Sequence, residues 1–258
     1  MSAKIVEGSL ELGERIRSRR NELGFTIEEA ANKAGVGTKT WSRYEAGASI
    51  RHDKVMNICK VLNWNALPTQ EYDQMDFDIE EYRNNEVWPQ ALADMLGDAA
   101  AVSFVIGSDI LLDYIEEDLD GLSNRPKGTH IGELDLSWLK DGLPIQFLPQ
   151  YDYDFLYYMK ITLTRYRTQA KSSSKFVAHT VMEELVLYLV MEESRVLMES
   201  ILPALSNDRY LYDTWDSWPF DLFDDMDIIT FLYSEFYLTE DHPYHFSHWR
   251  EEQFYCEM

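Results

Sequence analysis

The chain has 258 residues, 45% of them hydrophobic, and a formal net charge of −23. That is enough apolar material for one large core beside a small second domain. Its two cysteines exclude a disulfide framework, and its apolar runs are too short for a signal-peptide core or a membrane helix. We therefore expect a cytoplasmic protein that is not bound to a membrane.

The charge is divided unevenly along the chain. Residues 1–68 hold 11 Lys and Arg against 8 Asp and Glu, a balance of +3. The remaining residues hold 12 basic and 38 acidic side chains, a balance of −26. A nucleic acid would be repelled by the second part and tolerated by the first, so the asymmetry favours two domains with different partners.

The first predicted element is a helix over residues 10–23, which Ser9 can cap. Residues 26–47 then carry the signals of two short helices. Thr26 and Glu29 form a T-x-x-E capping box, which predicts that a helix begins there. Gly35 ends that helix, because the residue past a helix end often requires a positive φ.

A second short helix is expected from about residue 37 to residue 45, with Trp41 and Tyr44 facing inward. Two short helices, a tight glycine turn and an inward aromatic side chain are the parts of a helix-turn-helix. Another helix is expected over residues 50–62, with Cys59 on its apolar face as a core thiol.

Over about residues 10–64 the sequence resembles the phage-repressor/Cro-type (XRE) DNA-binding domain. The residues that carry the resemblance are Ala31, Gly35, Val36, Trp41, Glu45 and Gly47. The resemblance implies that residues 1–68 form a lambda-repressor-like DNA-binding domain of four or five helices. It also implies a structural ion pair between Arg20, late in the first helix, and Glu45, which closes the recognition helix.

In this family the second helix of the motif enters the major groove, with its N-terminal residues at the base edges. The candidate DNA-binding residues are Thr26, Gly37, Thr38, Lys39, Thr40, Ser42, Arg43 and Arg51. Lys39 and Arg43 have the chemistry to pair with guanine. Thr26 and Arg51 suit phosphates. Gly37 stands where the family usually has a Ser or Thr cap, which weakens the start of the helix.

Residues 69–85 are polar and acidic, and we interpret them as a linker with one helical turn. Residues 87–119 contain two helical patterns broken near Gly97, although the run AVSFVIG also suits a buried strand. Residues 152–171 form the clearest helix of this half. The next helix is expected over about residues 175–202.

The last part of the chain also has helical spacing. Residues 222–236 repeat it, and Pro243 is a candidate start for a final helix. Residues 172–174 are the expected cap of the helix over 175–202. Together these patterns predict a mainly α protein in which residues 86–258 form an acidic, mostly helical domain.

Sites for other chemistry are not indicated. His242, His245 and His248 are spaced three apart, so the third lies about 240° round a helix from the first, and we expect no metal site. The acidic pairs after residue 180 read as a solvated face. Phosphate-binding, dinucleotide-binding and nucleophile-elbow motifs are missing, so we expect neither a cofactor nor an enzyme.

We expect a sequence-specific transcriptional regulator, a repressor, that binds double-stranded operator DNA as a homodimer. Dimerisation and any protein or small-molecule effector are assigned to residues 86–258. Two alternatives stay open. One is an antitoxin-type autoregulator whose acidic domain covers a basic protein, and the other is a protein-binding module that has lost DNA binding. The dense aromatic residues after Tyr151 suit a tight core or a protein interface.

Overall fold

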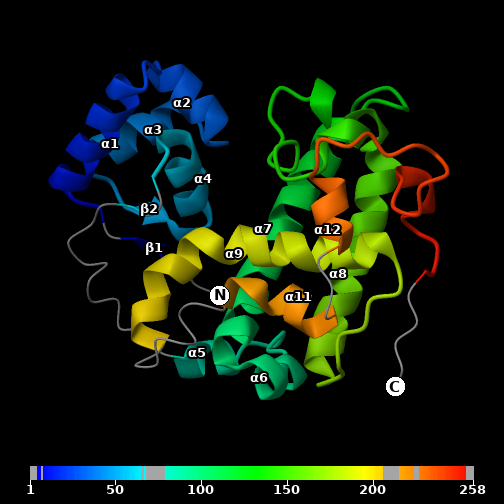
Figure 1. The fold of residues 1–258 in the computed structure, drawn as a ribbon. Helices are drawn as coiled ribbons and strands as arrows, with labels where there is room; N and C mark the ends of the chain where they lie inside the picture. The colour runs from blue at the N-terminus through cyan, green and yellow to red at the C-terminus, as the bar shows by residue number, and fades with distance from the viewer. Residues whose placement is uncertain are drawn as a thin grey trace. The chain divides into compact units, whose positions relative to one another are not determined.

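The computed structural model describes residues 5, 6, 8–64, 67, 79–205, 215–223 and 227–253, and it is mainly α-helical (Figure 1). The chain divides into two compact units, Met1–Phe77 with Val196–Ala204, and Asp78–Arg195 with Leu205–Met258. Residues 69–78 of the expected linker and Cys256 lie outside the described residues. Within the described part, no helix is long and apolar enough to cross a membrane.

In its described N-terminal residues, the first unit contains four helices and one pair of two-residue strands. The helices are α1 (Leu10–Glu22), α2 (Ile27–Lys33), α3 (Thr38–Glu45) and α4 (His52–Leu62). The strands β1 (Ile5–Val6) and β2 (Ile50–Arg51) pair antiparallel, with Ile5 opposite Arg51. The expected fourth helix therefore begins two residues later than predicted, because Ile50 and Arg51 are held in the strand pair.

The local signals for these helices are confirmed. The Ser9 side chain accepts from the amide of Leu12, and Thr26 and Glu29 form the complete capping box. Gly35 follows α2 with a φ of 58°, as a helix-ending glycine should. The Cys59 thiol is fully buried, and burial raises its pKa to about 12, so it is an unreactive core group.

Small residues let the helices of the first unit pack closely around one large ring. Ala30, Ala31 and Ala34 are fully buried, and so is the indole of Trp41. A Cβ at Gly13 of α1 would lie 2.7 Å from the carbonyl oxygen of Glu45. Only glycine at this position allows α1 to approach the end of α3 so closely.

The second unit is built around three long helices. They are α7 (Asp98–Ser123), α8 (Tyr153–Lys171) and α9 (Val181–Leu205), whose residues 196–204 group with the first unit. Among the described residues, the shorter helices are α5 (Ile79–Arg83), α6 (Gln90–Leu96), α11 (Trp218–Phe223) and α12 (Asp227–Leu232). Single 3₁₀ segments cover Ile131–Glu133, Ile145–Gln150, Trp215–Ser217 and Phe246–His248.

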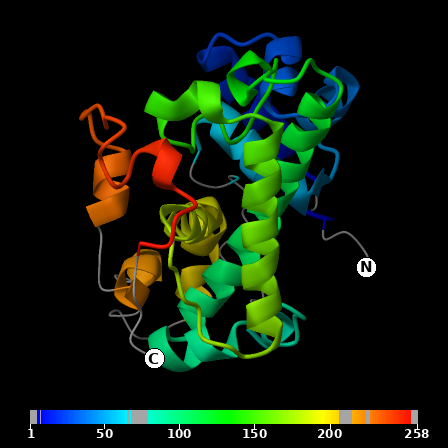
Figure 2. The ribbon, with the colours of Figure 1, turned by 90° about the vertical axis from the view of Figure 1, so that its right-hand side faces the viewer.

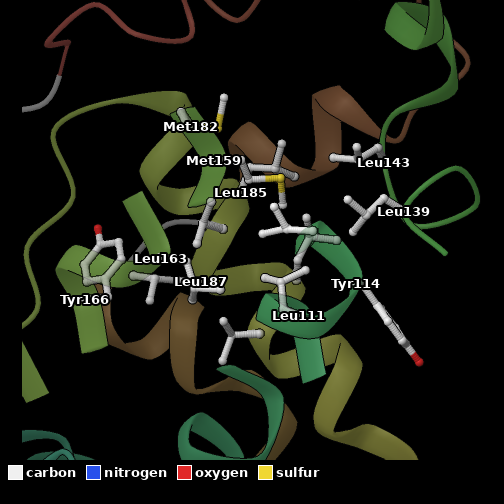
Figure 3. Packing of buried hydrophobic residues seen from close by; sticks show 14 of the residues in the cluster. Leu111, Tyr114, Leu139, Leu143, Met159, Leu163, Tyr166, Met182, Leu185 and Leu187 are labelled. Carbon is white, nitrogen blue, oxygen red and sulfur yellow. The ribbon is translucent and has the colours of Figure 1, made fainter. Parts of the chain in front are cut away.

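Helix α9 lies between α8 on one side and α11 and α12 on the other (Figure 2). Side chains from α7, α8 and α9 converge in the core, as Leu111, Met159, Leu163 and Leu185 show (Figure 3). The run AVSFVIG is helical, not a strand, and residues 99–108 of α7 are all buried. A helix buried on every side has no amphipathic period, which is why its sequence also suited a strand.

In the second unit, three further predicted elements differ from the structure. Helix α9 begins at Val181, not near residue 175, because Thr180 accepts from the amide of Glu183 and acts as the cap in place of residues 172–174. Of the helix expected over residues 222–236, the described residues include the end of α11 and the whole of α12, which ends at Leu232 and not at residue 236, while residues 224–226 lie outside the described part. The helix expected after Pro243 is a single 3₁₀ turn at Phe246–His248.

Helices α7 and α9 meet without an intervening side chain at Gly107. A Cβ built there would overlap the carbonyl oxygen of Val190. Beside this contact, Ser103 Oγ accepts from the indole of Trp218 at 3.0 Å and hydrogen bonds to Ser194 Oγ at 2.7 Å. Ser194 in turn donates to the carbonyl of Met191, so both serine hydroxyls in this buried series of hydrogen bonds have partners.

Gly107→Ala should therefore lower the free energy of unfolding by at least about 1–3 kcal/mol, because the clash is with backbone that cannot rotate away. Gly121→Ala is the matched control in the same helix. Its Cβ would meet only Leu134 side-chain carbons at 3.4 and 3.5 Å, so the gain in helix propensity, up to about 1 kcal/mol, should appear instead. Chemical denaturation of both variants tests this, and equal stabilities would contradict it.

Asp118 of α7 is a buried carboxyl that accepts from Ser137 Oγ at 2.6 Å. Burial raises its pKa to about 7, although hydrogen bonds from Ser137 and the Leu139 amide act to lower it. Between the ordinary value of 3.8 and about 7, the folded state holds a proton that the unfolded state has released. The contribution of Asp118 to stability is therefore lost as the pH rises through this window.

Asp118→Asn should remove that part of the pH dependence, so the variant should lose less stability than the wild type between about pH 5 and pH 8. Urea denaturation across this range is the measurement. Asp135→Asn, a change at a fully exposed carboxylate, should keep the wild-type slope. A slope unchanged in Asp118→Asn would show that another group is responsible.

Candidate nucleic-acid interface

Helix α3 has one face in the core and the other in solvent. Trp41, Tyr44 and Glu45 are buried. The opposite face carries Thr38, Lys39, Ser42 and Arg43, all exposed, and Thr40 lies at the boundary. The spacing of these residues at i, i+1, i+4 and i+5 places them on one side of the helix.

The candidate residues outside this face lie at helix N-termini. Gly37 is the N-cap of α3, Thr26 the N-cap of α2 and Arg51 the N-cap of α4, and all three are exposed. Neither Gly37 nor Arg51 provides a side-chain cap. Helix N-termini present amide groups and partial positive charge, which suit a phosphate.

The N-terminus of α2 has fewer amide groups available for a phosphate than its sequence suggested. The amide of Thr26 donates to Glu29 Oε2 at 2.7 Å, and the amide of Glu29 donates to Thr26 Oγ1 at 3.1 Å. The hydrogen bond from the Thr26 amide lowers the pKa of Glu29, so its carboxylate is charged. A phosphate there would have to contact the hydroxyl proton of Thr26, because these two amides are already occupied.

The buried carboxylate of Glu45 joins α3 to α1. Arg20 donates from Nε to Oε1 at 2.5 Å and from Nη2 to Oε2 at 3.1 Å. Trp41 Nε1 donates to the same Oε1 at 2.7 Å, and Arg17 Nε lies 3.5 Å from Oε2. The structure therefore contains the Arg20–Glu45 pair together with two donors that the sequence reasoning missed. The i,i+4 spacing of Trp41 and Glu45 was a signal for the first of them.

Arg20 extends this network into the turn that precedes α2. Its Nη1 donates to the carbonyl oxygen of Phe25 at 2.8 Å. Burial raises the pKa of Glu45, but hydrogen bonds from Arg20 and Trp41 outweigh it and leave the pKa below its ordinary value. A charged, fully hydrogen-bonded carboxylate thus fixes how α3 is rotated about its axis, and with it which residues face solvent.

The exposed face of α3 carries two cationic side chains, Lys39 and Arg43. Within the part of the chain that the structure describes, neither Lys39 nor Arg43 forms an ion pair. By contrast, Arg15 pairs with Glu11 at 2.9 Å and Arg19 with Glu22 at 3.1 Å. Lys39 and Arg43 therefore carry charge that an anionic partner can neutralise without breaking an internal contact.

The three histidines His242, His245 and His248 each interact with different groups. His248 Nε2 lies 2.8 Å from the Glu240 carbonyl oxygen and its Nδ1 lies 3.0 Å from Glu251. His242 accepts from the amide of Tyr244, and His245 contacts Ser247. In the described ranges no three His, Cys, Asp or Glu side chains gather as a metal site would require.

Removal of the Arg20 side chain should be costly. Arg20→Met leaves the Glu45 charge buried with fewer donors, so the free energy of unfolding should fall by about 3–5 kcal/mol. Arg15→Met breaks an exposed pair on the same helix and should cost at most about 1 kcal/mol. Denaturant titration distinguishes the two variants. Equal, small losses would mean that the Glu45 network contributes little to the fold.

Comparison with protein families identifies the N-terminal part of the chain. The sequence profile of a family described as the helix-turn-helix domain matches residues 11–64. Neither the curated proteins nor the solved structures that were compared gave a match to the chain. The matched range contains α1 from its second residue onward, α2 to α4, the Glu45 network and all eight candidate DNA-binding residues. Residues 11–64 therefore form a helix-turn-helix domain.

Proposed function

We propose that this protein is a transcriptional regulator that binds double-stranded DNA through residues 11–64. The observation that carries the proposal is the division of α3 into a face held by the Glu45 network and a solvent face bearing Lys39 and Arg43. In a helix-turn-helix the second helix of the motif lies in the major groove, which is where such a face would meet base edges.

Each candidate residue then has a chemical role. Lys39 and Arg43 pair with guanine O6 and N7, Thr38 and Thr40 offer methyl groups to thymine, and Ser42 offers a hydroxyl to a base or phosphate. The N-terminal positions contact phosphates, with the Gly37 amide, the Thr26 hydroxyl and the Arg51 guanidinium as the groups involved. Phosphate contacts set the position of α3, and base contacts set the sequence preference.

We propose further that the protein binds as a homodimer and acts as a repressor at an operator with two half-sites. One recognition helix with a single Lys and a single Arg neutralises few phosphates, so one domain alone would bind weakly. Two domains on half-sites about 34–36 Å apart would combine their affinities. Residues 1–68 are the proposed DNA-binding part, residues 69–85 the linker, and residues 86–258 the part for dimerisation and effectors.

The acidity of the rest of the chain supports a second candidate. With a balance of −26 after residue 68, that part would repel DNA and attract a basic protein. In this version the protein is an antitoxin-type autoregulator that binds its operator and a basic partner. Both candidates use the same DNA-binding face.

Arg43→Ala should weaken operator binding by about 1–3 kcal/mol and relax the preference at one base pair, because a bidentate contact to guanine is lost. Selection from random double-stranded DNA with the full-length protein supplies the operator, and titration at fixed salt supplies the affinity. The selected sequence should contain two half-sites, and the complex should contain two chains.

Arg125→Ala is the charge-matched control, because Arg125 lies in the second unit and pairs with Asp135 at 3.7 Å. It should bind the operator like the wild type. Wild-type affinity in Arg43→Ala would refute the role of Arg43. Failure of the full-length protein to bind any DNA at low salt, where phosphate contacts are strongest, would refute the proposed function itself.

A further inference from the structure

A loop after α12 is held in place by the side chain of Gln146. The amide nitrogen of Gln146 donates to the Leu232 carbonyl at 3.3 Å, and its oxygen accepts from the Leu238 amide at 3.0 Å. Leu232, just before the loop, and Leu238, within it, are themselves buried, so the backbone is anchored in the core at both points. We name residues 233–241 the aromatic loop.

Further hydrogen bonds fix the interior of this loop. Ser234 Oγ donates to the Phe231 carbonyl at 2.8 Å and accepts from the Phe236 amide at 3.2 Å. The Tyr233 hydroxyl donates to the Gly142 carbonyl at 2.6 Å. The backbone of the aromatic loop is therefore ordered before any partner arrives, which lowers the entropic cost of binding.

The ordered backbone holds its largest rings in solvent. Phe236 is 73% exposed and Tyr237 78% exposed, and Ile145, next to the clamp residue Gln146, is 70% exposed. Among the other described residues of the second unit, no large hydrophobic side chain exceeds 51% exposure. Single exposed apolar residues are common, but three such side chains around one hydrogen-bonded clamp are the pattern of an interaction surface.

The charged side chains of the aromatic loop are all acidic. Glu235, Glu240 and Asp241 belong to the loop and are exposed. In the sequence, residues 210–249 contain nine Asp and Glu and no Lys or Arg. The surface thus combines aromatic side chains, which are favoured at interface centres, with an acidic surround that selects a partner of opposite charge.

We propose that the aromatic loop is the docking site for a basic protein surface that presents an apolar side chain between Lys or Arg residues. The apolar side chain would pack on Phe236 and Tyr237, and the cations would pair with Glu235, Glu240 and Asp241. Nucleic acid is excluded as the occupant because phosphates would face these carboxylates. A second copy of the loop brings the same charge and is disfavoured in the same way. This inference does not depend on DNA binding.

The test uses a random 12-residue peptide library displayed on phage and selected on the full-length protein, with counter-selection on the Phe236→Ser/Tyr237→Ser double variant. The selected peptides should share an apolar residue flanked by Lys or Arg. As synthetic peptides, they should bind the wild type at least about 30-fold more tightly than the double variant, because truncation of a central aromatic removes most of the binding energy.

Two further variants make the test specific. Tyr153→Ser/Tyr157→Ser removes two exposed, stacked tyrosines of α8 outside the aromatic loop and should bind the peptides like the wild type. Glu235→Lys/Glu240→Lys/Asp241→Lys keeps both rings and should also lose binding. All variants are compared by thermal denaturation first, since changes at exposed side chains should leave the fold intact.

The outcomes decide the proposal. Basic peptides that need both the rings and the carboxylates support it. No enrichment, acidic consensus peptides, equal binding to the ring variant, or self-association of the wild type that the ring variant abolishes would each overturn it. Operator binding by the double variant is measured beside these assays, so a failure of the DNA-binding proposal is recognised separately.

Discussion

The first unit depends on one buried charge, the carboxylate of Glu45. A carboxylate out of water is unfavourable by itself, and here Arg20 and Trp41 offset that cost with hydrogen bonds to both oxygens. Because Arg20 also donates to the Phe25 carbonyl, the same guanidinium ties α1, the turn before α2 and the end of α3 together. The small alanines around Trp41 allow close packing, but packing alone would not fix the rotation of α3. The ion pair between Glu45 and Arg20 fixes that rotation.

In the second unit, the contact between the central helices α7 and α9 is formed without charged side chains. Where α7 and α9 cross, Gly107 removes the side chain that would separate the two backbones. The hydroxyls of Ser103 and Ser194, with the indole of Trp218, then satisfy one another inside the core. The two units therefore differ in what holds them together as much as in net charge.

The fold could be predicted from sequence where the signals are local. The capping box at Thr26 and the helix-ending Gly35 are such cases, and the inward side of α3 followed from periodicity alone. Features that depend on residues distant in the sequence could not be predicted. Ile50 is in a strand only because β1 pairs with it, and the sequence around Gly107 does not indicate that the backbone of Val190 packs against it. In the candidate site, the helical spacing of the residues of α3 was enough to predict which side chains face solvent. The Arg17 contact to Glu45 was not, because it joins residues 28 positions apart.

The separation of the two faces of α3 has a consequence for how this domain can change over time. Orientation is carried by Glu45 at the C-terminal end of the helix, while Thr38, Lys39, Ser42 and Arg43 face solvent. Exposed positions of this kind accept most substitutions at little cost to stability. Under the proposed function, a new DNA sequence preference would require changes only at these four surface positions, while the scaffold of the domain stays the same.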